Sequence, residues 1–222
     1  MGVEKLNVYG DDFVGAYCIT SDSFSISGVE LRKKDNEIFT SALGTAPKHF
    51  TIGGSTLVGI FSKANSNGIL LSNVSYASEA KKIKEAYPGI NVSVLESDLN
   101  ALGNNILLND KIAIINPDYK DNDIKIISEI FNVEVLKMEI AGYKTVGSHN
   151  ILTNKGLVVN NNVEEKELED LKKISKNLSQ STANTGSLSI GLCVVANSKG
   201  AIFGKTTTGY EMASIQDGLG LE

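Results

Sequence analysis

The sequence predicts an α/β propeller of five blades, with strands inside and helices outside. Three observations predict it. Glycine recurs every 44 residues, an apolar–polar–apolar pattern follows each of these glycines, and a helical pattern follows each hairpin-like stretch. A repeat with a fixed period in this range is typical of folds built from stacked or ring-forming units. The five glycines are Gly15, Gly59, Gly103, Gly147 and Gly191.

Each repeat glycine opens a predicted β-hairpin. Two copies share their end glycines and an internal A-N-S, GIFSKANSNG from residue 59 and GLCVVANSKG from residue 191. The polar turn of the hairpin holds an asparagine six places after the glycine in three copies, at Asn65, Asn109 and Asn197. Asparagine forms tight turns because its side chain hydrogen-bonds nearby backbone and because it tolerates unusual φ angles. We interpret these asparagines as turn formers rather than RNA contacts.

An amphipathic helix is predicted after each hairpin. The pattern is clearest in residues 163–178, where Leu168, Leu171 and Ile174 share one stripe and charged residues cover the rest. The same spacing predicts helices over residues 32–43, around 80–87, over 121–131 and over 212–219.

Closure of the ring is predicted from the last copy. A β-β-α unit of about 44 residues cannot bury its sheet face and its helix stripe alone, so the copies must pack against one another. An open stack needs polar terminal repeats, whereas the fifth copy is strongly apolar and no flexible linker separates the copies. We therefore expect residues 1–222 to form a single domain, a closed ring of five β-β-α repeats starting near the five glycines.

Composition narrows the class of function. The net charge of −5 and the single arginine, Arg32, argue against binding of free DNA. No apolar run is long enough to span a membrane, and two cysteines do not make a disulfide framework. The cysteines and histidines lack zinc-ligand spacing, and there is no phosphate-binding P-loop. We expect a cytoplasmic monomer with no membrane contact, no metal and no cofactor.

Four stretches give a resemblance to a known family. They read IGGSTLVG (52–59), NALGN (100–104), TVGSHNILTNKG (145–156), and ANSKGAIFG followed by TTG (196–204 and 207–209). Over its whole length the chain resembles the translation initiation factor six family, and in particular its archaeal members. The resemblance implies the pentein fold, a five-fold pseudosymmetric α/β propeller. Archaeal members tend to have an acidic residue before TTG and a proline after it, where this chain has Thr206 and Tyr210.

The resemblance also implies a function. Members of the family bind the large (50S) ribosomal subunit, at ribosomal proteins and rRNA near the sarcin-ricin loop, and prevent its association with the small (30S) subunit. The chain would then be a factor of translation initiation and ribosome maturation, and not an enzyme.

Candidate contact residues follow from the repeat. If all five glycine-led segments begin at one end of the ring, the residues after the glycines gather there, and their small, apolar or amide side chains suit a protein surface. Lysines at the hairpin tips are expected nearby, where they could contact RNA phosphates. The candidates are Ala16, Ile60, Asn104, Ser148, Leu192, Lys155 and Lys199.

The alternative is a pentein-fold guanidino-modifying enzyme of the deiminase or amidinotransferase type. It would use Cys193 as nucleophile and His149 as acid–base, since the two residues hold equivalent positions in adjacent copies. Against this, Cys193 lies between Leu192 and Val194 in a predicted buried strand, where a thiol behaves as a small apolar group. We therefore expect no catalytic site.

Overall fold

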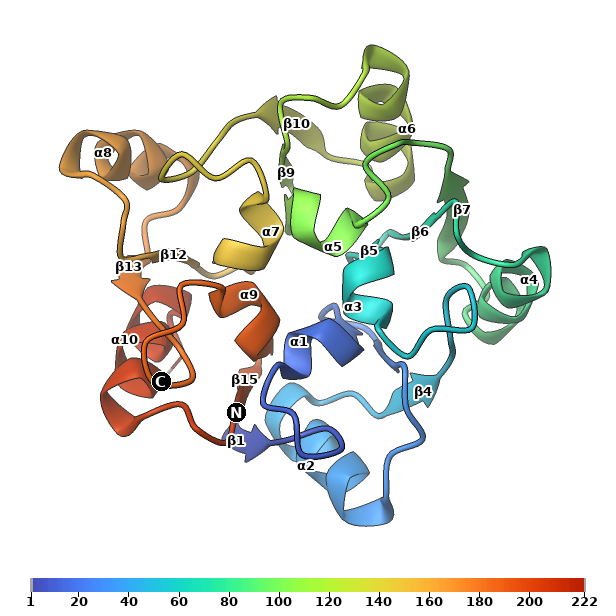
Figure 1. The fold of residues 1–222 in the computed structure, drawn as a ribbon, viewed down its shortest axis with the longest axis horizontal. Helices are drawn as coiled ribbons and strands as arrows, with labels where there is room; N and C mark the ends of the chain where they lie inside the picture. Colours follow the sequence, from blue (N-terminus) through green and yellow to red (C-terminus); the bar gives the residue numbers. More distant parts are fainter. Residues whose placement is uncertain (1, 222) are drawn as a thin grey trace.

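The structure, a computed structural model, describes residues 2–221. Five three-stranded β-sheets stand around a common centre, with short helices at the centre and longer helices at the periphery (Figure 1). The predicted five-fold pseudosymmetric α/β architecture is confirmed. The outer helices are α2 (Lys33–Leu43), α4 (Ala77–Ala86), α6 (Asp121–Phe131), α8 (Glu165–Ile174) and α10 (Gly209–Leu219).

Each blade begins with a one-turn helix at its repeat glycine and continues into an antiparallel hairpin. The inner helices are α1 (Val14–Tyr17), α3 (Val58–Phe61), α5 (Leu102–Asn105), α7 (Val146–His149) and α9 (Ile190–Cys193). The hairpin strands are β2 (Cys18–Thr20) and β3 (Ser25–Ser27), β5 (Ser62–Ala64) and β6 (Gly68–Ser72), β8 (Ile106–Leu108) and β9 (Ile112–Ile115), β11 (Ile151–Leu152) and β12 (Leu157–Asn160), β14 (Val194–Asn197) and β15 (Gly200–Gly204).

The third strand of every sheet lies beside the second hairpin strand and parallel to it. These strands are β4 (Pro47–His49), β7 (Asn91–Leu95), β10 (Glu134–Lys137), β13 (Leu178–Ser181) and, in the last blade, β1 (Gly2–Leu6). Because β1 pairs with β15, the first segment of the chain completes the last blade, and both ends of the chain lie in that part of Figure 1.

The predicted β-β-α unit is therefore incomplete. The observed order is inner helix, two strands, outer helix and third strand. An apolar run such as VGIF reads as strand, but four residues are too few to show helical periodicity. The third strands were missed because they are edge strands with mixed exposure, as in β10 with the sequence EVLK, and so lack a continuous apolar pattern.

The core is divided into five clusters, each shared by neighbouring blades. In one cluster Leu70 and Leu95, from the sheet of the second blade, pack with Ile127 and Phe131 from α6 of the third blade. Every outer helix fills the space between its own sheet and the preceding one in this way. Burying a side chain such as Phe131 contributes about 2–3 kcal/mol. No blade has a complete core without its neighbours, which fixes the geometry of the ring.

Candidate functional site

The five repeat glycines form the innermost ring of the protein. A Cβ atom on any one of them would overlap the carbonyl oxygen of the repeat glycine in the preceding blade, from Gly59 against Gly15 round to Gly15 against Gly191. None of the five has a positive φ angle. Glycine is required here for close approach of backbones rather than for conformational freedom, and this approach lets each inner helix contact both of its neighbours.

The inner helices and the turns that precede them form one end of the ring, which we call the helix face. All five predicted residues that follow the glycines lie on these helices, so the structure brings them to this end. Ala16 and Ser148 are buried, whereas Ile60, Asn104 and Leu192 are partly exposed. Only the latter three side chains offer surface for a contact without rearrangement.

Asn104 differs from the other four in its hydrogen bonding. Its Oδ1 atom is buried and accepts no hydrogen bond from the residues that the structure describes. A buried acceptor without a partner costs about 1–3 kcal/mol, so a donor brought in from outside would recover this energy. The hydroxyl oxygens of Ser75 and Ser198 share this property, so it marks Asn104 among the five counterparts but not among all described residues.

Tight turns between the blades rim the helix face. The turn Ile52–Ser55 places Gly53 and Gly54 at positive φ angles of 61° and 73°. Their N–H groups donate to the carboxylate of Glu79 at 2.6 and 3.0 Å. Glu79 stands in the first turn of α4 and also accepts the N–H of Tyr76 at the helix start, 2.9 Å away. We call this arrangement a latch: an acid at the start of an outer helix that holds the turn.

The latch acid repeats around the ring. An acidic residue stands 20 places after every repeat glycine: Asp35, Glu79, Asp123, Glu167 and Glu211. Glu167 accepts the N–H of Ala141, and Glu211 accepts the N–H groups of Thr185 and Gly186 at 3.2 and 2.8 Å. Burial alone would raise the pKa of the Glu211 carboxyl, but the bonds from Thr208, Thr182 and Gly186 outweigh it and hold the pKa below its ordinary value.

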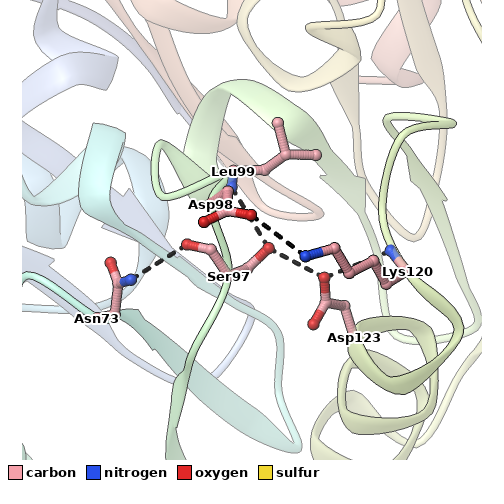
Figure 2. Close-up of polar contacts among 6 residues, drawn as sticks. All are labelled: Asn73, Ser97, Asp98, Leu99, Lys120 and Asp123. Carbon is pink, nitrogen blue, oxygen red and sulfur yellow. Dashed lines mark hydrogen bonds and ion pairs between the residues drawn. The ribbon is translucent and has the colours of Figure 1, made fainter.

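In the third blade the latch acid is the shorter Asp123, and it bonds to a serine side chain of the turn (Figure 2). Here Ser97 donates its hydroxyl to Asp123 at 2.9 Å, and its carbonyl accepts from the side chain of Asn73 in the preceding blade. The loop is further tied by an ion pair between Lys120 and Asp98, 3.2 Å apart. Sequence analysis missed the latches, although the 44-residue period applied to acidic residues would have found them.

Large apolar and aromatic side chains that are exposed gather at the helix face. Among the described residues they are Tyr9, Phe13, Val74, Tyr76 and Tyr210, with Tyr9 81% and Tyr210 85% exposed. All five lie in turns between blades or at the starts of inner or outer helices, which is the end where the helix face lies. They come from the fifth, first and second blades, which are consecutive around the ring. Exposed tyrosines are enriched at protein–protein contacts.

The hairpin tips form the opposite end. The Oδ1 of Asn65 accepts the N–H groups of Asn67 and Gly68, which confirms its role in the turn. Its amide also donates to the carbonyl of Asn109 in the next blade, and Asn109 donates onward to Thr153. These asparagines therefore join neighbouring blades as well as closing turns.

Lys155 and Lys199 lie on these tips. Both are exposed, and Lys199 donates to the carbonyl of Asp22 at 2.8 Å. The hairpin strands separate the tips from the inner helices. The expectation that these lysines lie near the other five candidates is therefore wrong: they are at the other end of the ring.

A central cavity runs between the two ends, lined by strands of all five blades. At the position four places after the glycine, four blades supply the aliphatic side chains of Ile19, Leu107, Ile151 and Val195, while the second blade supplies Lys63. Lys63 has no hydrogen-bond or ion-pair partner among residues 2–221. Burial lowers the pKa of its ammonium from 10.5 to about 8.

The two residues of the enzymatic alternative do not form a nucleophile–base pair. Cys193 is buried at the end of α9, a helix rather than the expected strand, and burial raises the pKa of its thiol to about 11. An activated thiol needs the opposite shift. His149 stacks on Tyr143, with ring centroids 4.1 Å apart, and its Nδ1 faces Thr145 and Ser148.

Within residues 2–221, no three His, Cys, Asp or Glu side chains converge in a way that could hold a metal ion. In the same range, no helix has the length and the apolar content needed to cross a membrane.

The fold is an α/β propeller of pentein type, with the five inner helices gathered at one end. The chain belongs to the eIF-6 family, whose sequence model matches residues 3–218. It is similar to archaeal proteins named translation initiation factor 6. The protein of Methanocaldococcus jannaschii is 41% identical over 214 residues, covering 94% of this chain and 93% of the relative. That of Saccharolobus islandicus is 39% identical over 222 residues, covering 99% and 100%. That of Pyrococcus abyssi is 33% identical over 226 residues, covering both chains fully.

Proposed function

We propose that this chain binds the large (50S) ribosomal subunit through its helix face and thereby prevents association with the small (30S) subunit. Membership of a family of translation initiation factors supports a role on the ribosome. The observation that carries the choice of face is the group of exposed aromatic side chains on it, among them Tyr9 and Tyr210, and Asn104 lies on the same surface. A single domain of five blades would act as a rigid plug, in the cytoplasm, without catalysis or cofactor.

The contact we propose is mainly with ribosomal proteins. The inner helices present small, apolar and amide groups, which suit a protein surface better than a phosphate backbone. Lys155 and Lys199 point from the tip end, so they would meet rRNA near the sarcin-ricin loop only if the subunit wrapped around the ring. The enzymatic alternative has no supporting observation, because the Cys193 thiol is buried and its pKa is raised.

Co-sedimentation with purified archaeal large and small subunits tests the proposal. The parent chain is expected to pellet with the large subunit alone and to reduce subunit joining. Asn104→Arg places a bulky charge at the face and is expected to weaken binding about tenfold or more, the loss typical of a contact hot spot. Lys111→Glu, on an exposed hairpin tip of the same blade, is the matched control and is expected to bind normally.

Two results would contradict the proposal. One is a parent chain that pellets with neither subunit, or with the small one. The other is a folded Asn104→Arg variant with unchanged affinity, which would move the contact away from the helix face. Repeating the measurement at two salt concentrations gives the share of phosphate contacts, since each neutralised phosphate adds to the salt dependence.

A further inference from the structure

The first blade breaks the latch pattern. Its turn, Val8–Asp11, has the same backbone shape as the turns of the second and fourth blades, with positive φ angles of 52° at Tyr9 and 87° at Gly10. In their turns the second and fifth blades each donate two N–H groups to a carboxylate, and the fourth blade donates one, from Ala141. The N–H groups of Tyr9 and Gly10 have no acceptor among the residues that the structure describes.

The latch acid of this blade is turned to another partner. Asp35 is one methylene shorter than the glutamates of the complete latches, and the Nε of Arg32 donates to it at 2.8 Å. A pocket of about 260 Å³ is lined by both the acid and the turn. The residues with polar groups that line it are Asn7, Tyr9, Gly10, Glu30, Arg32 and Asp35.

We propose that this pocket binds a carboxylate, supplied by an Asp or Glu side chain of the protein that docks on the helix face. The donors are the N–H groups of Tyr9 and Gly10 and the guanidinium of Arg32, the only arginine of the chain. Paired backbone N–H groups in a turn and a guanidinium are strong carboxylate donors. The chain itself fills the corresponding positions of three other blades with Glu79, Glu167 and Glu211.

Charge favours a carboxylate over a phosphate. Arg32 brings one positive charge to the pocket, while Asp35 and Glu30 bring two negative ones. These charges sum to one net negative charge, so they repel a singly charged carboxylate less than a phosphate group with up to two charges. The Arg32 side chain is 81% exposed, so its guanidinium is open to a group arriving from solvent.

The pocket belongs to the helix face, since exposed Tyr9 is part of both. The identity of the occupant as a docked protein rests on the proposed function. The preference of the pocket for a carboxylate does not, and it is tested without the ribosome.

The first test is an NMR titration of the ¹⁵N-labelled full-length chain with N-acetylglutamate amide. In this ligand the α-carboxyl is amidated and the side-chain carboxylate is free. The amide signals of Tyr9 and Gly10 are expected to shift saturably, with a dissociation constant on the order of millimolar for so small a ligand. The signals of Gly53 and Gly54, whose latch is already closed, serve as the internal control and are expected to stay in place. The amide of N-acetylglutamine, uncharged and of equal size, should leave all four unchanged.

Three variants sharpen the test. Asp35→Glu supplies the longer acid and is expected to close the latch from within, which shifts Tyr9 and Gly10 in the free protein and abolishes ligand binding. Arg32→Gln is expected to weaken binding about tenfold by removing a charge-assisted donor. Glu30→Gln is expected to tighten it by removing a repelling charge. Because Arg32 and Glu30 are exposed, these two variants remain informative if Asp35→Glu fails to fold.

Three results would overturn the proposal. N-acetylglutamate amide could leave the amide signals of Tyr9 and Gly10 unshifted, or the glutamine analogue could shift these signals equally. The third result is inorganic phosphate binding more tightly than the carboxylate. An Asp35→Glu variant that still binds the ligand normally overturns the comparison with the other latches. Co-sedimentation with the large subunit then tests the occupant, with loss of affinity expected for Asp35→Glu and none for Lys111→Glu. A parent chain that binds neither subunit counts against the proposed function. The titration still tests whether the pocket binds a carboxylate.

Discussion

Lys63 is a single charge in the otherwise aliphatic layer of the central cavity, and replacing it tests how that cavity is stabilised. Lys63→Met keeps the length of the side chain and removes the ammonium, giving the second blade an apolar residue as in the other four. We expect the variant to be more stable than the parent at pH 7, because the Lys63 ammonium is desolvated and has no partner among residues 2–221.

The size of the effect follows from the pKa. Burial lowers the pKa of the Lys63 ammonium from 10.5 to about 8, a difference worth about 3 kcal/mol at 1.4 kcal/mol per unit. Lys63 is partly exposed, so solvent screens part of this, and we expect a gain of about 1–3 kcal/mol. The folded pKa lies below the unfolded one, so the penalty is full below pH 8, declines between pH 8 and 10.5 and disappears above.

Thermal unfolding of both proteins between pH 7 and 10.5 provides the assay. For a chain of this size the gain corresponds to about 2–4 °C per kcal/mol in the melting temperature. The difference between variant and parent is expected to shrink as the pH rises past 8. Lys111→Met, at an exposed hairpin tip, is the control for loss of one positive charge. A variant that is less stable than the parent, or a difference that is constant with pH, would refute the reasoning.

Three further predictions concern the glycine ring, the latches and the helix face. Gly147→Ala forces a Cβ against the carbonyls of Gly103 and Ile106 and is expected to lower the free energy of unfolding by about 3 kcal/mol or more. Gly209→Ala, with open space around it, should be neutral or slightly stabilising. Equal melting temperatures of the two variants would count against the close-packed ring. Glu211→Gln is expected to lower the free energy of unfolding, measured by chemical denaturation, by about 1–3 kcal/mol at pH 7. This deficit should vanish as the pH falls below 4.5 through the lowered pKa of the parent carboxyl. A deficit that is independent of pH would exclude the ionic latch. Tyr210→Ser, at an exposed position, should leave stability unchanged and weaken large-subunit binding in co-sedimentation, and normal binding would remove Tyr210 from the contact.

The repeat made much of the architecture predictable. Five glycines at a constant spacing, each followed by a hairpin pattern and an amphipathic stripe, determine the number of blades and the places of the outer helices. Hydrophobic periodicity is a local signal, and it is strong in elements of ten residues such as α8. It fails in one-turn helices such as α3 and in polar edge strands such as β10, because these form through contacts with other blades.

The candidate site was only partly predictable for the same reason. The repeat places Asn104 and its four counterparts at one end of the ring, since equivalent positions in a ring share a level. It does not say that Ala16 and Ser148 are covered, or that Lys155 and Lys199 lie at the other end. The latch acids show a spacing visible in the sequence, but the turns they hold lie about 25 residues upstream, and only folding brings them within hydrogen-bond distance.

The sequence by itself therefore determined the repeat, its glycines and the family, because each of these is written in residue types at fixed intervals. Tertiary structure alone decided that β1 closes the ring by completing the last blade. It also decided that the latch of the first blade stays open, and that Lys63 lines a cavity with no partner in the described part of the chain. These features depend on the distance between groups far apart in the chain, and a difference of one methylene or one hydrogen bond there leaves no pattern along the sequence.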